Sequence, residues 1–417
     1  MAELLQDIPR HAAYWWALGF FAFYPVLGSI VWITTGIQFY LRRERKPNAG
    51  TLAAAANTPQ VSVLIPAYCE EKVIAETLEA TTRIDYPNFE IVVVDDASTD
   101  GTREAVRPFV ERGLVRLIAK ERNEGKAMAL NDAMPCLQGE IVLILDADAA
   151  PDPQILHWMV PHFASARVAG VTGNPRVHNR ETFLAQLQLV EFTSIVSLLR
   201  RAQRIWGRIL TMSGVVGAFR TSALHDVGLY SPEMATEDID MTWKLQRAAY
   251  DVRYEPRAIV WMKVPPTLGG LVKQRRRWAL GLAQVLRRNR GVAVSWRARR
   301  LWPVFFESWL SILWAYCFVV LTSFWALSYA FGIPPVGVSP IPNWWGMTIG
   351  TLCLLQLFTG VMLDARYDST VLRHFPVAVV YPIVYWMLMS LVTVFATPAG
   401  LFGRLKRGAV TQWKTQR

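Results

Sequence analysis

Apolar residues are distributed very unevenly along this chain of 417 residues. Residues 12–41 are almost uncharged, and apolar residues dominate again over 302–402. A helix of about 20 apolar residues is long enough to cross a bilayer. The intervening segment, about 59–290, has an ordinary globular composition and is long enough for one or two domain cores. The sequence therefore predicts an integral membrane protein with one water-soluble domain inserted between its transmembrane helices.

The net charge is +11, and much of it lies beside the apolar segments, at 42–46, 287–290, 297–300 and 404–407. Basic residues next to a transmembrane helix mark its cytoplasmic side and favour anionic lipid. Residues 1–11 carry no basic excess, which argues against a cleaved signal peptide. We expect an N-terminus outside the cell and a soluble domain in the cytoplasm. Nucleic-acid binding is the weaker interpretation of the charge, because the basic residues do not form one face.

We divide the chain into four regions: an anchor and Ala-rich linker at 1–58, the soluble domain at 59–265, amphipathic interface helices at 266–302, and a membrane region with a basic tail at 303–417. The last region holds three apolar blocks, which are Pro303–Phe331, Trp344–Leu363 and Phe375–Phe402.

The charges around these blocks conflict with a simple topology. The uncharged loop 332–343 belongs outside, and the basic tail from Arg404 belongs inside, yet two crossings between them would place both on one side. One block is re-entrant or interfacial, or the last block forms a hairpin, or the tail breaks the positive-inside rule. The sequence leaves these alternatives open.

Strand-like and helix-like segments alternate through the first half of the soluble domain, which predicts a parallel, doubly wound α/β sheet. The expected strands are 61–66 (stopped by Pro66), 90–96, 114–119 and 141–145, and the expected helices are 70–81, one from Thr102, and 127–137. The second half is less regular, with a helix at 183–201 that has apolar and basic faces, a small-residue stretch at 213–220, and a helix after Thr236, its candidate N-cap.

Acidic residues follow the apolar run Ile141–Leu145 directly, at Asp146 and Asp148. In an extended chain these two side chains point to the same side. Carboxylate oxygens at the end of a strand suit Mg²⁺ or Mn²⁺ bound together with a phosphate-bearing substrate. A solvated acidic loop is the alternative for this stretch taken alone. Because parallel strands end at a common edge, Tyr68, Glu70 and Asp96 are expected near the same place.

Four elements of the soluble domain, taken in order, resemble the family 2 processive β-glycosyltransferases of GT-A fold, such as cellulose, chitin and hyaluronan synthases. They are Ile65–Glu70, Val94–Ser98, Asp146–Asp148, and Thr236–Asp238 with Gln274–Trp278. Five longer segments look like bacterial poly-β-1,6-N-acetylglucosamine synthases: 171–176, 213–215, 236–245, 254–258 and 274–279.

This resemblance implies inverting, processive transfer of N-acetylglucosamine from UDP-GlcNAc to a β-1,6-linked exopolysaccharide at the bacterial inner membrane, with export through the C-terminal helices. Another β-glycan synthase, a lipid-carrier glycosyltransferase and a non-catalytic scaffold or nucleotide sensor are the alternatives. Similar Gram-negative synthases work with a small membrane subunit and respond to cyclic di-GMP. No Arg-rich motif in this sequence assigns such a site.

For the donor, the resemblance implies a uridine pocket made by Asp96 and the loop that carries Pro66, Tyr68 and Glu70. It places Mg²⁺ on Asp146 and Asp148, with Asp148 the more direct ligand. Lys126 is expected to contact the phosphates, although a solvated lysine at a helix start is an equal alternative. Gln274 and Arg277 are expected on the diphosphate side.

For the acceptor, the resemblance implies that Asp238 is the general base, an effect typically worth about 10²–10⁴-fold. Glu237 and Gly214 are expected on the acceptor side, and Trp278 beneath the terminal acceptor sugar. Interface anchoring is the alternative for Trp278 and its arginines, and Arg275 and Arg276 are read as lipid or structural contacts. One base without a carboxylate nucleophile implies a single displacement with inversion.

Overall fold

The computed structural model of the protein describes residues 2–45, 58–333 and 344–403. Most of the predicted linker, the loop 334–343 and the basic tail from Arg404 lie outside these residues. The alternatives for the membrane topology of the C-terminal region therefore stay open.

An eight-stranded sheet forms the centre of the soluble domain, in the order β3-β2-β1-β4-β7-β6-β8-β5. The strands are β1 (Val61–Ala67), β2 (Phe89–Asp95), β3 (Arg116–Ala119), β4 (Ile141–Leu145), β5 (Ala149–Pro151), β6 (Val168–Val177), β7 (Val216–Arg220) and β8 (Asp251–Met262). The first four are mutually parallel, as predicted. Strand β7 then pairs antiparallel with β4 and with β6, so the complete sheet is mixed.

Pro66 does not stop strand β1, contrary to the expectation from the sequence. The strand continues to Ala67, and Pro66 lies in register with Val94 of β2. The carbonyl of Gln60 accepts from the N–H of Ile141, so the backbone groups of Gln60 face β4. Every second residue along a strand faces the same neighbour, so an N–H at Pro66 would also face β4. Pairing with β4 ends at Leu64, so the proline breaks no hydrogen bond of the sheet.

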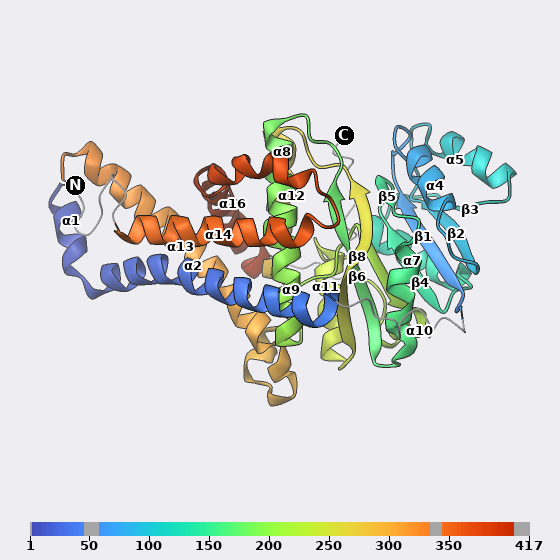
Figure 1. The fold of residues 1–417 in the computed structure, drawn as a ribbon, viewed down its shortest axis with the longest axis horizontal. Coiled ribbons are helices and arrows are strands. Elements are labelled where there is room, and N and C mark those ends of the chain that lie inside the picture. The colour runs from blue at the N-terminus through green and yellow to red at the C-terminus, as the bar shows by residue number, and fades with distance from the viewer. Residues whose placement is uncertain (1, 46–57, 334–343, 404–417) are drawn as a thin grey trace.

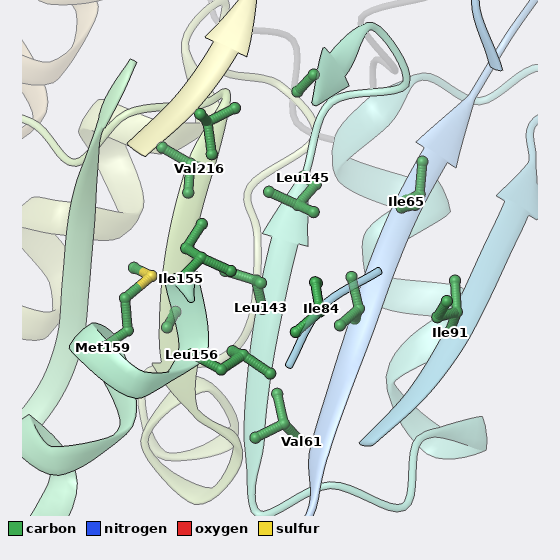
Figure 2. Packing of buried hydrophobic residues seen from close by; sticks show 14 of the residues in the cluster. Val61, Ile65, Ile84, Ile91, Leu143, Leu145, Ile155, Leu156, Met159 and Val216 are labelled. Carbon is green, nitrogen blue, oxygen red and sulfur yellow. The ribbon is translucent and has the colours of Figure 1, made fainter. Parts of the chain in front are cut away.

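Helices cover both faces of this sheet, as a doubly wound fold requires. They are α4 (Ile74–Thr82), α5 (Thr102–Glu111), α6 (Lys126–Ala133), α7 (Ile155–Met159), α10 (Thr221–Asp226) and α11 (Glu237–Arg247). Figure 2 shows the core beneath α7, where Ile155 and Leu156 lie beside Leu143 of β4. Each such fully buried side chain stabilises the fold by about 1.5–3 kcal/mol. This packing holds the strand ends at fixed positions.

The helices outside the sheet layers form the rest of the molecule. They are α1 (Ala2–Asp7), α2 (Ala12–Phe39), α8 (Phe183–Glu191), α9 (Ser197–Trp206), α12 (Leu268–Arg288), α13 (Trp302–Ala330), α14 (Trp344–Asp364), α15 (Val371–His374) and α16 (Tyr381–Phe402). Five helical segments are long and apolar enough to cross a membrane: 12–44, 183–206, 296–330, 344–364 and 384–402. Helix α2 packs against α13 and α14. The three helices extend together away from the sheet (Figure 1).

The segment 183–206 differs from the other four apolar segments. It consists of α8, a π-helical turn and α9 in one continuous rod, and 67% of its most apolar window is buried inside the protein. Figure 1 shows this rod running across the direction of α2 and α14. Gly360 of α14 lets the two meet closely, because a Cβ there would lie 2.5 Å from the Cα of Ser194. The rod is therefore the layer on which α2 and α14 rest.

Candidate active site

The loops that follow β1 and β2 are tied together at the carboxyl edge of the sheet. The backbone N–H of Cys69 donates to the hydroxyl of Ser98 at 2.9 Å, and that of Glu70 donates to Thr102 at 2.8 Å. Cys69 (φ 54°) and Ala97 (φ 60°) both adopt the left-handed region without being glycine. Such backbone strain persists only where the surroundings enforce it, and it clusters at functional sites. Tyr68 and the predicted donor residue Glu70 are half-buried in this pair of loops.

Asp96, directly after β2, is fully buried. Its carboxylate accepts hydrogen bonds from the backbone N–H groups of Gly125 (2.7 Å) and Glu124 (3.1 Å), and Lys120 Nζ lies 3.2 Å away. Asp96 therefore fixes the loop that leads into α6 at Lys126. Lys120 was missed by sequence reasoning, because nothing in its local pattern separates it from a solvated strand-end lysine.

Lys126 opens α6 and points into the site, so the solvated alternative for this residue is wrong. Its ammonium group donates to Asp146 Oδ1 at 2.5 Å and to the carbonyl of Gly214 at 2.9 Å, and it lies 3.5 Å from Glu237 Oε1. Burial opposes its positive charge, but the carboxylates of Asp146 and Glu237 outweigh burial and raise the pKa of Lys126. One lysine thus joins the end of β4, the 213–215 loop and the start of α11.

Asp238 lies in the first turn of α11, beside the same lysine. Gly214 makes room for it, because a Cβ at Gly214 would lie 3.1 Å from Asp238 Oδ2. Burial and the neighbouring Glu237 raise the pKa of Asp238 to about 6, against the opposing charges of Lys126 and Arg277. A carboxylate with this pKa is ionised at neutral pH and is a stronger proton acceptor than an ordinary aspartate. Thr236 is the N-cap residue as predicted, but its side chain makes no capping hydrogen bond.

The Gln274–Trp278 segment lies within α12, which packs beside α11. Thr236 and Gly281 mark the contact, since a Cβ at Gly281 would lie 2.1 Å from the Thr236 hydroxyl. Arg277 donates to the carbonyl of Ala235 at 3.3 Å and is otherwise exposed. The side-chain oxygen of Gln274 is buried and has no hydrogen-bond partner among the described residues. Such a group requires an explanation, and a ligand is one.

Arg275 is fully buried, which excludes the lipid-contact alternative for it. Its guanidinium lies 3.9 Å from the ring centre of Trp278 and donates to Glu191 of α8 at 2.6 Å. The hydroxyl of Tyr385, on α16, donates to the same Glu191 oxygen at 2.5 Å. Trp278 is therefore held by a chain of contacts that ends on a membrane helix. Glu191 and Tyr385 were missed, because their partners lie 84 and 194 residues away.

The two aspartates after β4 have different surroundings. Burial, partly offset by Lys126, and the nearby charge of Asp148 raise the pKa of Asp146. Asp148 lines a cavity of about 340 Å³, together with Glu76, Thr77, His178, Trp261 and Lys263. This volume lies at the lower end of the range of ligand pockets, about 300–1,000 Å³.

The acidic residues fit a divalent cation shared with a substrate. No group of three or more His, Cys, Asp or Glu side chains forms a complete metal site in the described part of the chain. Two carboxylates instead suit an ion that takes its remaining ligands from phosphates and water, as Mg²⁺ does. The charges of Asp146, Glu237 and Asp238 act on Lys126, and Asp148 acts on Asp146. Arg277 and Arg200 near Asp238 match this negative charge only in part, which favours a cation.

Comparison with known proteins decides the family. The model of "Glycosyltransferase like family 2" matches residues 59–281. The chain is 33% identical over 409 residues to a poly-β-1,6-N-acetyl-D-glucosamine synthase of Staphylococcus epidermidis RP62A, with 95% of this chain and 97% of that protein covered. A synthase of the same name from Staphylococcus aureus COL is 32% identical over 405 residues, with the same coverage. The chain belongs to glycosyltransferase family 2.

This family 2 protein is therefore a glycosyltransferase, as the motifs predicted. A solved structure confirms the GT-A fold class: a mannosyltransferase from Pyrobaculum calidifontis in complex with GDP-Man and Mn²⁺ superposes with a TM-score of 0.63. The two are 24% identical, and the match covers 92% of this chain and 99% of the other. At that identity the likeness speaks for the fold alone.

Proposed function

We propose that this glycosyltransferase is a processive synthase that transfers N-acetylglucosamine from UDP-GlcNAc to a growing β-1,6-linked polysaccharide. The observation that carries the catalytic part is Asp238, a carboxylate with a pKa of about 6 beside Gly214 and in the field of Lys126 and Arg277. The sugar and the linkage follow from the names of relatives that are 32–33% identical over nearly the whole chain.

On the donor side, Asp96 and the loop with Pro66, Tyr68 and Glu70 bind the uridine. The Asp96 carboxylate can accept one further hydrogen bond, from the uracil N–H. Its roughly four acceptor positions face three groups of the protein, the N–H groups of Glu124 and Gly125 and the ammonium of Lys120. Gln274 and Arg277 contact the diphosphate from α12.

Asp146 and Asp148 would hold a divalent cation, Mg²⁺ or Mn²⁺, on the diphosphate. When bound, the ion supplies positive charge that stabilises the departing UDP. Lys126 holds the Asp146 carboxylate in position and adds its own charge at the same place.

On the acceptor side, Trp278 offers a ring face to the terminal sugar, and Glu237 and Gly214 line the approach. Asp238 removes the proton of the acceptor's 6-hydroxyl while the hydroxyl oxygen bonds to the anomeric carbon of the donor sugar. At the same time the bond from that carbon to the UDP oxygen breaks. A single displacement converts the α-linked donor into a β-linked product.

We further propose that the protein is a multi-pass protein of a bacterial inner membrane with its catalytic domain in the cytoplasm. Arg42 and Arg43 lie at the end of the α2 segment that contacts this domain. Positive charge beside a transmembrane helix marks its cytoplasmic end, so the domain is expected in the cytoplasm. The polymer leaves through the C-terminal helices. A small membrane subunit and regulation by cyclic di-GMP are proposals that rest on resemblance alone.

The test uses membranes that contain the protein and radiolabelled UDP-GlcNAc, UDP-Glc or UDP-GlcA in parallel. We expect a long polymer from UDP-GlcNAc alone, degraded by a hydrolase specific for β-1,6 linkages. Incorporation from another donor would move the assignment to a different β-glycan synthase. A single labelled sugar on an extractable lipid would instead indicate a lipid-carrier glycosyltransferase.

A further inference from the structure

Six arginines from distant parts of the chain gather at the C-terminal end of α9. We call Arg43, Arg167, Arg204, Arg208, Arg253 and Arg300 the arginine cluster. Three of them form ion pairs with one carboxylate, Asp251: Arg204 at 2.9 Å, Arg253 at 3.0 Å and Arg208 at 3.8 Å.

Geometry places Arg167 and Arg43 beside this group. The backbone carbonyl of Arg167 accepts from the N–H of Asp251 at 2.7 Å, and Arg43 precedes Glu44, whose carboxylate accepts from Arg201 of α9 at 2.6 Å. Arg300 acts on the group electrostatically. Burial lowers the pKa of Arg208, and the charges of Arg300 and Arg167 lower it further against the pull of Asp251. Burial lowers the pKa of Arg204, and the positive charge of Arg43 lowers it further. The cluster thus combines residues from the end of α2, from α9, from β8 and from the segment before α13.

The arginine cluster carries far more positive charge than this chain neutralises. Arg43, Arg167 and Arg300 make no ion pair in the described part of the chain, and the undescribed ranges contain no Asp or Glu at all. Among the described residues, Asp251 is thus the one carboxylate that forms ion pairs with this cluster. Like charges held together in this way repel one another, so an external anion is favoured.

Arg208 gives a second, independent indication of a ligand. The side chain is 92% buried, since 8% of its surface is exposed, yet its Nε–H has no hydrogen-bond partner among the described residues. A buried guanidinium with an unused donor is costly unless a partner is supplied. A phosphate oxygen is such a partner, because the planar fork of arginine binds phosphate through paired hydrogen bonds.

The location of the cluster indicates where the anion comes from. Arg43 ends the α2 segment and Arg300 precedes α13, and both segments are long and apolar enough to cross a membrane. Close to Arg300 in the chain, Val294 is 88% exposed and Trp296 is 68% exposed. Exposed apolar and indole side chains next to basic residues are typical of the headgroup level of a bilayer.

We propose that the arginine cluster is a binding site for the phosphate of an anionic phospholipid headgroup. The lipid neutralises the excess charge and anchors the glycosyltransferase domain to the membrane surface at the junction of α9, α2 and α13. A soluble phosphate offers the same chemistry, and the experiment below separates the two sources.

The experiment uses the full-length protein in nanodiscs of mixed phosphatidylglycerol and phosphatidylcholine, with retained lipid counted by native mass spectrometry. The test variant combines Arg43→Gln, Arg167→Gln and Arg300→Gln, which leave every ion pair of Asp251 intact. The control variant combines Arg83→Gln, Arg107→Gln and Arg112→Gln, with the same change of charge. These are exposed residues at the end of α4 and on or just after α5, two helices at the far end of the domain (Figure 1).

We expect wild type and control to retain phosphatidylglycerol preferentially, and the test variant to lose that preference by about tenfold or more. An unchanged preference in the test variant would overturn the proposal. So would binding of inorganic phosphate in lipid-free detergent without any preference for phosphatidylglycerol, which would assign the cluster to a soluble anion. Transferase activity in phosphatidylcholine, measured separately, is expected to be the same in all three proteins.

Discussion

Two buried groups of charges in this molecule differ in how they are balanced. The junction cluster contains two acids, Glu44 and Asp364, and two arginines, Arg176 and Arg201, and the side chains are at most 1% exposed. The active-site cluster contains Lys126 and the acids Asp146, Asp148, Glu237 and Asp238. Its side chains remain 12–24% exposed where they pair with Lys126.

The junction cluster joins four elements that are far apart in the sequence. Arg201 of α9 donates to Glu44, after α2, at 2.6 Å and lies 2.8 Å from Asp364 of α14. Arg176 of β6 donates to the other oxygen of Asp364 at 2.5 Å. Two positive and two negative charges are thus completed by the chain itself. This group is balanced in charge, although the buried Nε–H of Arg176 has no hydrogen-bond partner among the described residues. It fixes the membrane helices to the sheet.

The active-site cluster lacks this balance. Lys126 and Arg277 only partly offset the four carboxylates, and burial together with neighbouring carboxylates raises the pKa values of Asp146 and Asp238. Perturbed acids in an accessible place indicate function more than stability. The comparison suggests a rule for this protein: balanced buried charges hold the fold, and unbalanced charges mark the places where something binds. The arginine cluster extends the rule to an excess of positive charge.

The largest effect is expected at Asp238, which the rule assigns to function. Asp238→Asn keeps the shape but removes the proton acceptor, so polymer synthesis in membranes should fall by about 10²–10⁴-fold. Thermal stability should change little, because the replaced group is a destabilised carboxylate. Glu79→Gln, an exposed change of the same charge on α4, serves as the control. Wild-type polymer output from the Asn variant would refute the catalytic assignment.

The next largest effect is expected at Arg201, which the rule assigns to the fold. Arg201→Gln leaves Glu44 and Asp364 buried without their shared partner, and loss of one member of a buried pair typically costs about 3–5 kcal/mol. The midpoint of thermal unfolding in detergent should drop well below that of Arg83→Gln, a surface arginine paired with Glu79. Unchanged stability would show that water or lipid replaces the arginine, and the contrast between the clusters would fail.

The sequence predicted the parts of this site that depend on local pattern. Strands β1, β2 and β4 are short apolar runs, and the acids at their ends follow from the shared edge of a parallel sheet. Lys126 was placed correctly at a helix start. Pattern could not decide whether it pointed to solvent or inward, because its partners, Asp146 and Gly214, are 20 and 88 residues away.

Other parts could not be predicted, for physical reasons. Strand β7 contains Gly217 and Ala218 and lacks the run of branched residues that marks a strand. A Cβ at Gly217 would lie 2.9 Å from the ring of Phe219, so the packing there favours glycine. The helix predicted at 183–201 is present as the rod of α8 and α9, but only packing shows how far it is enclosed. The Arg201–Glu44 pair spans 157 residues, a separation at which local pattern carries no information.

A pH profile of the wild-type enzyme also tests the unbalanced cluster. Because the base must be ionised, and because burial and Glu237 raise its pKa to about 6, kcat/KM should fall as pH drops through 6. It should lose about tenfold between pH 7 and pH 5, whereas an ordinary aspartate near 4 would keep most of its activity. Glu237→Gln removes a neighbouring negative charge and should move the inflection to lower pH. An inflection that stays at 6 would place the titrating group elsewhere.

The smallest effect is expected where a balanced pair touches the site. Arg275 and Glu191 are matched one to one, like the junction cluster, but Arg275 lies against Trp278 and Glu191 accepts from Tyr385 of α16. Tyr385→Phe removes one hydrogen bond to a carboxylate, worth about 1.5–3 kcal/mol net, and loosens this chain of contacts without leaving a buried donor unpaired.

If the pair only holds the fold, Tyr385→Phe should lower the unfolding midpoint slightly and leave the product unchanged. If it positions Trp278, the KM for an oligosaccharide acceptor should rise about fivefold, kcat should change little, and the polymers should become shorter. Tyr381→Phe is the matched control, because its ring stacks on Tyr385 at 4.8 Å while its hydroxyl makes no hydrogen bond to the described residues. We expect the second result, because Arg275 is the contact through which α16 reaches the acceptor side. Equal acceptor KM values for Tyr385→Phe and Tyr381→Phe would show that the Arg275–Glu191 pair has only a structural role.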